Sequence, residues 1–172
     1  MIPCSRFEWQ KSEIQLSTPA IAPLVVRTAE KSDEDGVPKV LKSAFAVDAG
    51  WGDISRKLIE RLDEDAEEIF SADEPRCLVV AHGTRVIGVS LLDTDPEAVN
   101  HLLSGPCILN EYRNRGLATS LLAASLEHLW KSGVKTVCGL TRSNSITARF
   151  VYPKFGGVAQ PYSSDPLEVP ES

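Results

Sequence analysis

The feature that most constrains the fold of this chain is residues 108–131, where an apolar run passes through a short basic turn into a long amphipathic segment. Over residues 116–131 the apolar side chains cover one broad face and polar ones fall opposite, which predicts a helix that Gly133 ends. Ile108 and Leu109 are typical of a buried strand. A strand, a turn and a helix in this order indicate a layered α/β fold.

The rest of the chain continues this alternation. The patterns predict strands over residues 24–26, 134–140 and 158–162, helices over 37–45 and 54–68, a β-hairpin over 76–93, and a short helix that begins at Asn144 and ends before Pro153. Asp53 is the expected cap of the second helix. Gly105 and Pro106 interrupt an apolar run over 102–109, which predicts a bulge or an unpaired edge.

Length and charge limit the function classes. A chain of 172 residues can bury about 70% of the surface that it exposes when unfolded, so we expect one domain with a core of its own. With 18 Lys and Arg against 24 Asp and Glu, the net charge is −6, which argues against nucleic acid as a partner. Charged residues interrupt the first segment and no apolar run could span a bilayer, so we expect no signal peptide, no membrane partner and a cytoplasmic location.

The four cysteines, Cys4, Cys77, Cys107 and Cys138, are widely spaced. None forms a C-x-x-C pair, and no histidine stands at a metal-ligand spacing from them, so no metal is expected. Three of them lie in apolar runs, which predicts buried, reduced thiols. Cys107 has no flanking base or cation in the sequence, so we prefer a buried thiol to an acyl-carrying nucleophile.

The basic turn before the long helix has the properties of an anion site. The first N–H groups of a helix have no intrahelical partner and lie at the positive end of its dipole, where a phosphate is stabilised. Arg113 and Arg115 add positive charge, and Gly116 and Ala118 keep the backbone accessible. Taken alone, the spacing R-x-x-G-x-A equally fits a solvated arginine turn.

Two motifs together make the chain resemble the GNAT superfamily of N-acetyltransferases over about residues 24–160. The pattern Gln/Arg-x-x-Gly-x-Gly/Ala is matched by Arg113, Gly116 and Ala118, and the pattern Asn-x-x-x-Ala-x-x-x-Tyr-x-x-x-Gly by Asn144, Ala148, Tyr152 and Gly156. The order and separation of the motifs also fit. The resemblance implies a mixed, mostly antiparallel central sheet with splayed central strands, flanked by helices. It also implies transfer of an acetyl group from acetyl-CoA to a primary amine.

The resemblance assigns roles to residues. It implies that the pyrophosphate of CoA lies on the turn, that the pantetheine arm follows the strand before it, and that an N–H near Ile108 polarises the thioester carbonyl. The implied cofactor-binding residues are Cys107, Ile108, Leu109, Arg113, Asn114, Arg115, Gly116, Leu117, Ala118, Thr119 and Asn144. Tyr152 is the implied catalytic acid for the CoA thiolate, with a packing role as its alternative. Asn144 is also a candidate helix cap.

The acceptor half is less determined. Residues 102–110 carry no carboxylate to serve as a base, so we expect a water chain through Ser104 or His101. The acidic tract over 60–68 is either a solvated helix face or an attractant for a cationic amine, with Phe45 and Trp51 as candidate cleft walls. A polyamine, an aminoglycoside-like drug, an amino acid and a peptide N-terminus all fit as the small-molecule or peptide acceptor.

Two departures from the family pattern affect the ends of the chain. Gly156 and Gly157 stand where the family usually has Gly-Phe, and one final strand follows where two are usual. We expect an N-terminal arm over 1–23, an acyltransferase domain over 24–162 and a tail over 163–172. The missing strand is expected from the arm, where Phe7, Trp9, Ile14 and Leu16 are apolar, or from a second subunit in a homodimer.

These departures, with the missing carboxylate, leave an alternative function. The alternative is a catalytically inactive acyl-CoA-binding or sensing module that keeps the phosphate site. A nucleotide-binding domain without acyl chemistry is disfavoured, because the chain lacks both G-x-x-x-x-G-K-[ST] and G-x-G-x-x-G.

Overall fold

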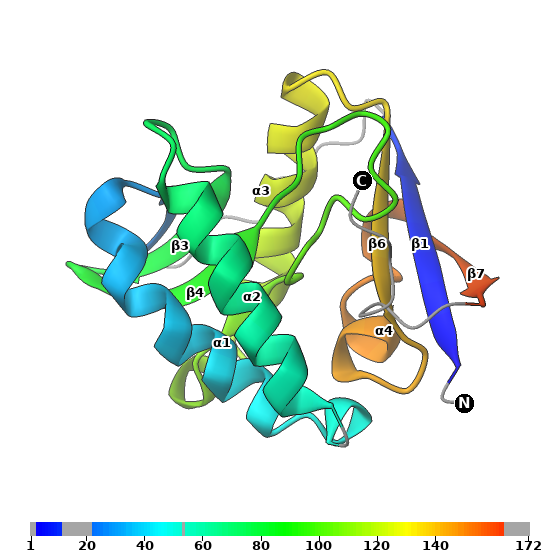
Figure 1. Cartoon of the computed structure of the whole chain (residues 1–172), viewed down its shortest axis with the longest axis horizontal. Coiled ribbons are helices and arrows are strands. Elements are labelled where there is room, and N and C mark those ends of the chain that lie inside the picture. Colours follow the sequence, from blue (N-terminus) through cyan, green and yellow to red (C-terminus); the bar gives the residue numbers. More distant parts are fainter. Residues whose placement is uncertain (1–2, 12–21, 53, 164–172) are drawn as a thin grey trace.

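The computed structural model of the chain describes residues 3–11, 22–52 and 54–163, and its strands form two sheets. The larger sheet has the antiparallel order β2-β3-β4-β5, with bounds Leu24–Thr28, Cys77–His82, Arg85–Leu91 and Cys107–Ile108. Nearly every residue of β3 and β4 is buried, so both faces of these strands are covered. Helices α1 (Val37–Ala46) and α2 (Ser55–Phe70) cover one face, and α3 (Leu117–Lys131) packs against the other (Figure 1).

The smaller sheet has the order β6-β1-β7, with bounds Thr136–Arg142, Cys4–Gln10 and Val158–Tyr162. Strand β1 runs antiparallel to both neighbours, and Phe7 is paired with Gly139 on one side and with Ala159 on the other. The expected pairing of the N-terminal arm with the last strand is therefore confirmed. Residues 4–10 also pair with β6, so they lie inside the sheet and not outside the main fold. Ile14 and Leu16 lie outside the described residues.

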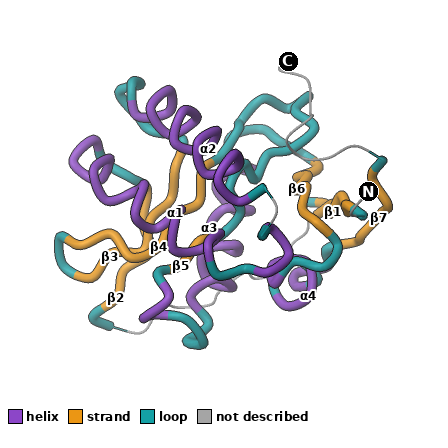
Figure 2. The backbone as a smooth tube through the Cα atoms, turned by 60° about the horizontal axis from the view of Figure 1, so that its bottom comes forward, coloured by secondary structure: helices purple, strands orange, loops and turns teal. Residues whose placement is uncertain are grey.

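Figure 2 shows the strands of the larger sheet and those of the smaller sheet as two separate groups. Hydrogen bonds around residues 92–102 connect the two sheets. A bridge between Leu92 and Leu102 continues the larger sheet, and the N–H of His101 donates to the carbonyl of Cys138 in β6 at 2.8 Å. Further along, β5 pairs with β4 and β6 pairs with β1, and no ladder between β5 and β6 is seen in the described part of the chain. The expectation of splayed central strands is confirmed.

The predicted elements are found with small shifts. A 3-10 turn, Lys31–Gly36, leads into α1, and in this turn the buried Asp33 pairs with Arg27 at 2.7 Å. Burial by itself would raise the pKa of Asp33, but the hydrogen bonds from Arg27 and the Glu30 N–H outweigh it and lower the pKa. Helix α4 (Ile146–Phe150) begins later than predicted.

Two predicted helix caps have different outcomes. Ser145, and not Asn144, caps α4, because its hydroxyl accepts from the Ala148 N–H at 3.1 Å. The prediction of Asn144 as the cap is therefore wrong. The predicted cap Asp53 lies outside the described residues.

All four cysteines are free and buried, as predicted. Within residues 3–11, 22–52 and 54–163, no three His, Cys, Asp or Glu side chains are grouped so as to hold a metal ion. No helix in the same residues combines the length and the apolar character needed to cross a membrane.

Candidate active site

A small cavity of about 280 Å³ lies where the turn before α3 faces α4 and the end of α1. Eight of the predicted cofactor-binding residues line it: Cys107, Ile108, Arg113, Asn114, Gly116, Leu117, Ala118 and Thr119. Leu109 is buried, Arg115 is exposed and Asn144 is exposed, and none of these three belongs to the lining. The turn therefore forms one wall of a cavity, as a binding site for an elongated ligand requires.

The backbone of the turn leaves donors at the start of α3. Asn114 and Gly116 have left-handed φ values of 62° and 74°. A Cβ on Gly116 would meet no atom within 4 Å, so glycine is favoured there by backbone conformation and not by crowding within the protein. The N–H of Ser120 donates to the carbonyl of Gly116 at 3.1 Å. The N–H groups of residues 117–119 precede this bond and form the electropositive end of the helix.

The two arginines of the turn have partners within the protein. The guanidinium of Arg113 donates to the carbonyl of Ala44, in the last turn of α1, at 3.1 Å. Arg115 lies over the ring of Tyr112, with its guanidinium carbon 5.1 Å from the ring centroid. Arg113 therefore links α1 to the turn, a structural role that the motif alone did not reveal.

Lys154 is a cavity residue that sequence reasoning missed. It follows α4, and its Nζ donates to Oγ1 of Thr119 in the first turn of α3 at 2.8 Å. It lines the small cavity and is exposed to solvent. In the second motif it occupies an unspecified position between Tyr152 and Gly156, so no sequence signal marked it. The structure brings its ammonium group to the same helix end as the turn.

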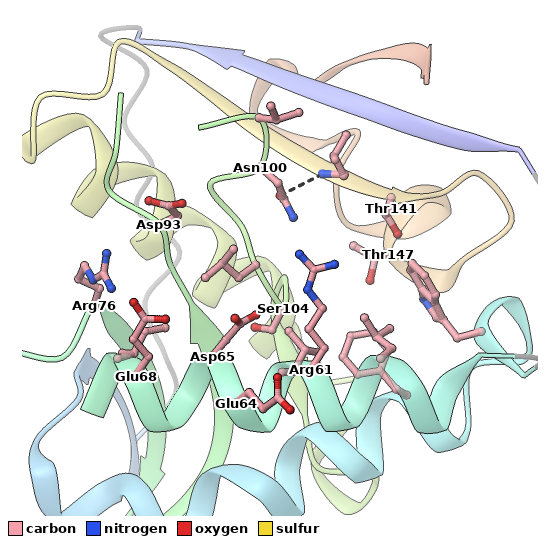
Figure 3. A pocket seen from close by; sticks show the side chains of 18 of the residues that line it. Arg61, Glu64, Asp65, Glu68, Arg76, Asp93, Asn100, Ser104, Thr141 and Thr147 are labelled. Atoms are coloured by element: carbon pink, nitrogen blue, oxygen red, sulfur yellow. Dashed lines mark hydrogen bonds between the residues drawn. The ribbon is translucent and has the colours of Figure 1, made fainter. Parts of the chain in front are cut away.

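A large cavity of about 480 Å³ adjoins the small one, and Phe45, Ser104 and Thr147 line both. Figure 3 shows that α2 supplies one wall, opposite Asn100 and Thr141. Its charged lining residues are Arg61, Glu64, Asp65, Glu68, Arg76 and Asp93. Part of the acidic tract thus faces a cavity, and Phe45 and Trp51 are among its walls, as the cleft interpretation expected.

Tyr152 lies in the wall of the large cavity. Its side chain is 1% exposed. An ideal Cβ on Gly105 would lie 2.6 Å from its hydroxyl oxygen, so the hydroxyl faces the segment before β5. Burial, with a smaller effect of Cys107, raises the pKa of Tyr152 well above its usual value. The phenol therefore keeps its proton and is a hydrogen-bond donor.

Cys107 does not have the environment of a nucleophile. Burial raises the pKa of its thiol to about 12, and the sulfur donates to the carbonyl of Ser104 at 3.5 Å. A reactive cysteine needs a lowered pKa, because the thiolate is the attacking species. The structure thus agrees with the interpretation of a buried thiol.

Comparison with known proteins decides the family. Residues 45–156 match the Acetyltransferase (GNAT) family. The chain belongs to this family. No curated protein sequence matches it.

Solved structures give the fold of the same family. The chain is similar to a GCN5-related N-acetyltransferase from Sphaerobacter thermophilus, with TM-score 0.59, 17% identity, and coverage of 93% of this chain and 49% of that one. A GNAT-family acetyltransferase from Colwellia psychrerythraea has TM-score 0.62, 13% identity, and coverage of 94% and 54%. A conserved protein of unknown function from Staphylococcus epidermidis has TM-score 0.64, 14% identity, and coverage of 94% and 59%. The chain thus spans about half to three fifths of the length of these proteins, and the expected GNAT fold is confirmed.

His101 and Ser104, the two residues expected to take part in a water chain, are both hydrogen-bonded to backbone in the GNAT domain. The Nδ1 of His101 accepts from the Cys138 N–H at 2.9 Å, and Nε2 lies 2.9 Å from the carbonyl of Asp95, to which it must donate. Burial lowers the pKa of His101. The hydroxyl of Ser104 accepts from the Leu91 N–H and donates to the carbonyl of Gly105. The expected route through His101 is therefore wrong, because both ring nitrogens are engaged by backbone and the ring does not line the large cavity.

Proposed function

We propose that this GNAT domain transfers an acetyl group from acetyl-CoA to a primary amine by direct attack of the amine on the thioester. Membership of the family supports acetyltransferase chemistry. One observation carries the more specific proposal: two cavities of different chemistry meet at Ser104 and Thr147, beside the hydroxyl of Tyr152. One cavity suits a phosphate-bearing donor and the other a charged acceptor.

The small cavity is the proposed site for CoA. The N–H groups at the start of α3 and the ammonium group of Lys154 would hold its diphosphate. The open edge of β5 would hold the pantetheine arm, because Cys107 and Ile108 pair with β4 on one side only among the described strands. Bound there, acetyl-CoA supplies an activated acyl group for transfer.

The main chain of β5 would stabilise the charge that develops on the carbonyl oxygen. The N–H of Leu109 donates to the carbonyl of Ile87 at 2.8 Å. Because successive N–H groups of a strand point to opposite sides, the N–H of Ile108 faces away from β4, toward the open edge. A well-aimed donor of this kind contributes about 2.7–4 kcal/mol to transition-state stabilisation.

Tyr152 is the proposed catalytic residue. When the C–S bond breaks, negative charge collects on sulfur, and a protonated phenol nearby stabilises it by hydrogen bonding. The raised pKa of Tyr152 keeps the donor protonated throughout the neutral range. The amine proton leaves on the acceptor side, where the large cavity is polar.

The large cavity is the proposed acceptor site. Glu64, Asp65, Glu68 and Asp93 outnumber the two arginines of its lining, which favours a cationic amine over an anion. We propose a small-molecule or peptide amine as the acceptor. The four free thiols support the proposal of a reducing, cytoplasmic setting.

The test is release of free thiol from acetyl-CoA in the presence of a panel of amines. We expect release above the hydrolysis blank, and a fall of about 10²-fold or more in Tyr152→Phe, as for loss of a positioned proton donor. Tyr162→Phe is the matched control, because Tyr162 ends β7 and lines neither cavity. Binding of CoA with no thiol release for any amine would instead support the inactive acyl-CoA-binding module.

A further inference from the structure

Tyr152 is surrounded by aromatic side chains that come from the other end of the sequence. The ring of Trp9 stands edge-on to it with centroids 5.0 Å apart and planes at 88°, and the ring of Phe7 does so at 5.4 Å and 67°. Both belong to β1, and Trp9 has no exposed surface. Trp9 and Tyr152 lie near opposite ends of the described sequence, so their contact is formed by tertiary folding and not by local chain geometry.

Trp9 also fixes the backbone that follows Tyr152. Its indole N–H donates to the carbonyl of Lys154 at 3.0 Å. A Cβ on Gly157 would collide first with the carbonyl oxygen of Tyr152, and it would also lie 2.6 Å from the indole nitrogen of Trp9. The absence of a side chain at 157 therefore makes room both for the Tyr152 backbone and for Trp9.

The backbone of two glycines also lies close to the Tyr152 ring. An ideal Cβ on Gly139 would lie 3.1 Å from Cε2 of the ring, and one on Gly105 would lie 2.6 Å from the hydroxyl. With Phe7, Trp9 and these two stretches of backbone packed against it, the ring has little room to turn. The hydroxyl is thereby held toward the segment that leads into β5.

We infer that Trp9, supported by Phe7, is a positioning residue for Tyr152, so that the N-terminal strand sets the rate of acyl transfer without touching substrate. This inference rests on the proposed role of Tyr152 and adds a residue from outside both family motifs. A small displacement of a catalytic group has a large effect on rate, whereas the proposed contacts of the CoA diphosphate at the start of α3 do not involve the phenol.

A double-mutant cycle in the full chain tests the inference. In Trp9→Phe we expect kcat to fall about tenfold, a larger change than in the KM for acetyl-CoA or in the CoA affinity, because the hydrogen bond from the indole to Lys154 involves only the backbone of that residue. In the Tyr152→Phe background, the same Trp9→Phe change is expected to have no further effect on kcat. Glu8→Gln is the matched control on the same strand, since Glu8 points away from Tyr152 toward Arg6.

The possible results separate the inference from the proposed function. An unchanged kcat in Trp9→Phe, or an equal fall in both backgrounds, would overturn the inference while leaving the function intact. An unchanged kcat in Tyr152→Phe would overturn the proposed role of Tyr152 together with the inference, whereas absence of acetyl transfer in the wild-type protein would overturn the proposed function itself. Phe7→Leu provides a second variant with a smaller cavity, and thermal unfolding of each variant verifies that the protein measured is folded.

Discussion

The small and large cavities share three residues yet are built in opposite ways. The small cavity depends on main-chain groups of one continuous stretch, residues 104–119, to which α1, α4 and Lys154 add side chains. The charged side chains that line the large cavity come from α2, from Arg76 and from Asp93. A ligand held by backbone geometry is sensitive to conformation, whereas one held by exposed charge is sensitive to charge and salt. Substitutions in the two cavities should therefore act differently.

The largest effect is expected where backbone conformation is forced. Gly116→Val places a β-branched residue at φ 74°, which costs roughly 1–2 kcal/mol locally and displaces the N–H groups of the turn. We expect CoA affinity, measured by calorimetry, to fall more than about tenfold. Gly83→Val is a matched control, because Gly83 has φ 61° in the β3–β4 turn and open space around it. If both variants lost CoA affinity equally, backbone geometry at the turn would not be the basis of binding.

Lys154 brings a side-chain charge to the lining of the small cavity, beside the start of α3. In Lys154→Gln we expect CoA to bind about three- to tenfold more weakly, and Lys154→Arg to retain most of the affinity. A parallel titration with dephospho-CoA, which lacks the 3′-phosphate, identifies the phosphate that the lysine holds. If Lys154 contacts the 3′-phosphate, Lys154→Gln should weaken the binding of CoA but not that of dephospho-CoA. Lys131→Gln, at the far end of α3, is the control. Equal affinity of the Lys154→Gln and Lys131→Gln variants would contradict the assignment.

The large cavity should respond to charge more weakly. In Glu68→Gln and Asp93→Asn we expect the KM for a cationic amine to rise about two- to fivefold, because each carboxylate is partly screened by solvent. The difference in this KM between each variant and the wild type should shrink at high salt. The CoA affinity of each variant should equal that of the wild type. Glu67→Gln, on the same helix but outside the lining, is the control. A salt-independent change would indicate a steric effect in place of an electrostatic one.

The smallest effect is expected at the junction of the two sheets. The folded state lowers the pKa of His101 by burial, so below about pH 6.5 the unfolded chain binds more protons and the free energy of unfolding falls with falling pH. In His101→Asn we expect a shallower pH dependence of stability between about pH 5 and 6.5, measured by denaturant unfolding.

His128 provides the comparison for that measurement. Burial and then Lys131 lower the pKa of His128 as well, so it contributes a slope of the same sign. His128→Gln should leave the part due to His101 in place, whereas His101→Asn should remove it. An unchanged slope in His101→Asn would show that protonation at the junction does not govern acid stability.

Most of the donor half could be read from the sequence because it is local. The strand, turn and helix over 107–131 form one stretch, and the hydrogen bonds of a helix start are made by backbone that is near in sequence. The large cavity was harder to predict. Its carboxylates come from residues 64–68 and 93, and the charge pattern of a helix does not reveal whether the polar face of the helix meets solvent or a cavity.

Several contacts of the candidate site lie beyond any local pattern. Arg113 donates to Ala44, 69 residues away, and Trp9 donates to Lys154, 145 residues away. The sequence allowed either the arm or a second subunit to complete the smaller sheet, and the pairing of Phe7 with Gly139 and Ala159 shows the arm in that place.

The amino-acid sequence by itself determined the elements, the free thiols, the GNAT motifs and the turn that begins α3, because each depends on neighbours within one or two turns of chain. Only the tertiary structure decided that β1 lies between β6 and β7, that Trp9 and Phe7 enclose Tyr152, and that part of the acidic face of α2 lines a cavity. These arrangements come from burying apolar surface between segments distant in sequence. The hydrophobic effect is non-directional, and the periodicity of apolar residues shows that a helix or strand has a buried face but not which other element covers that face.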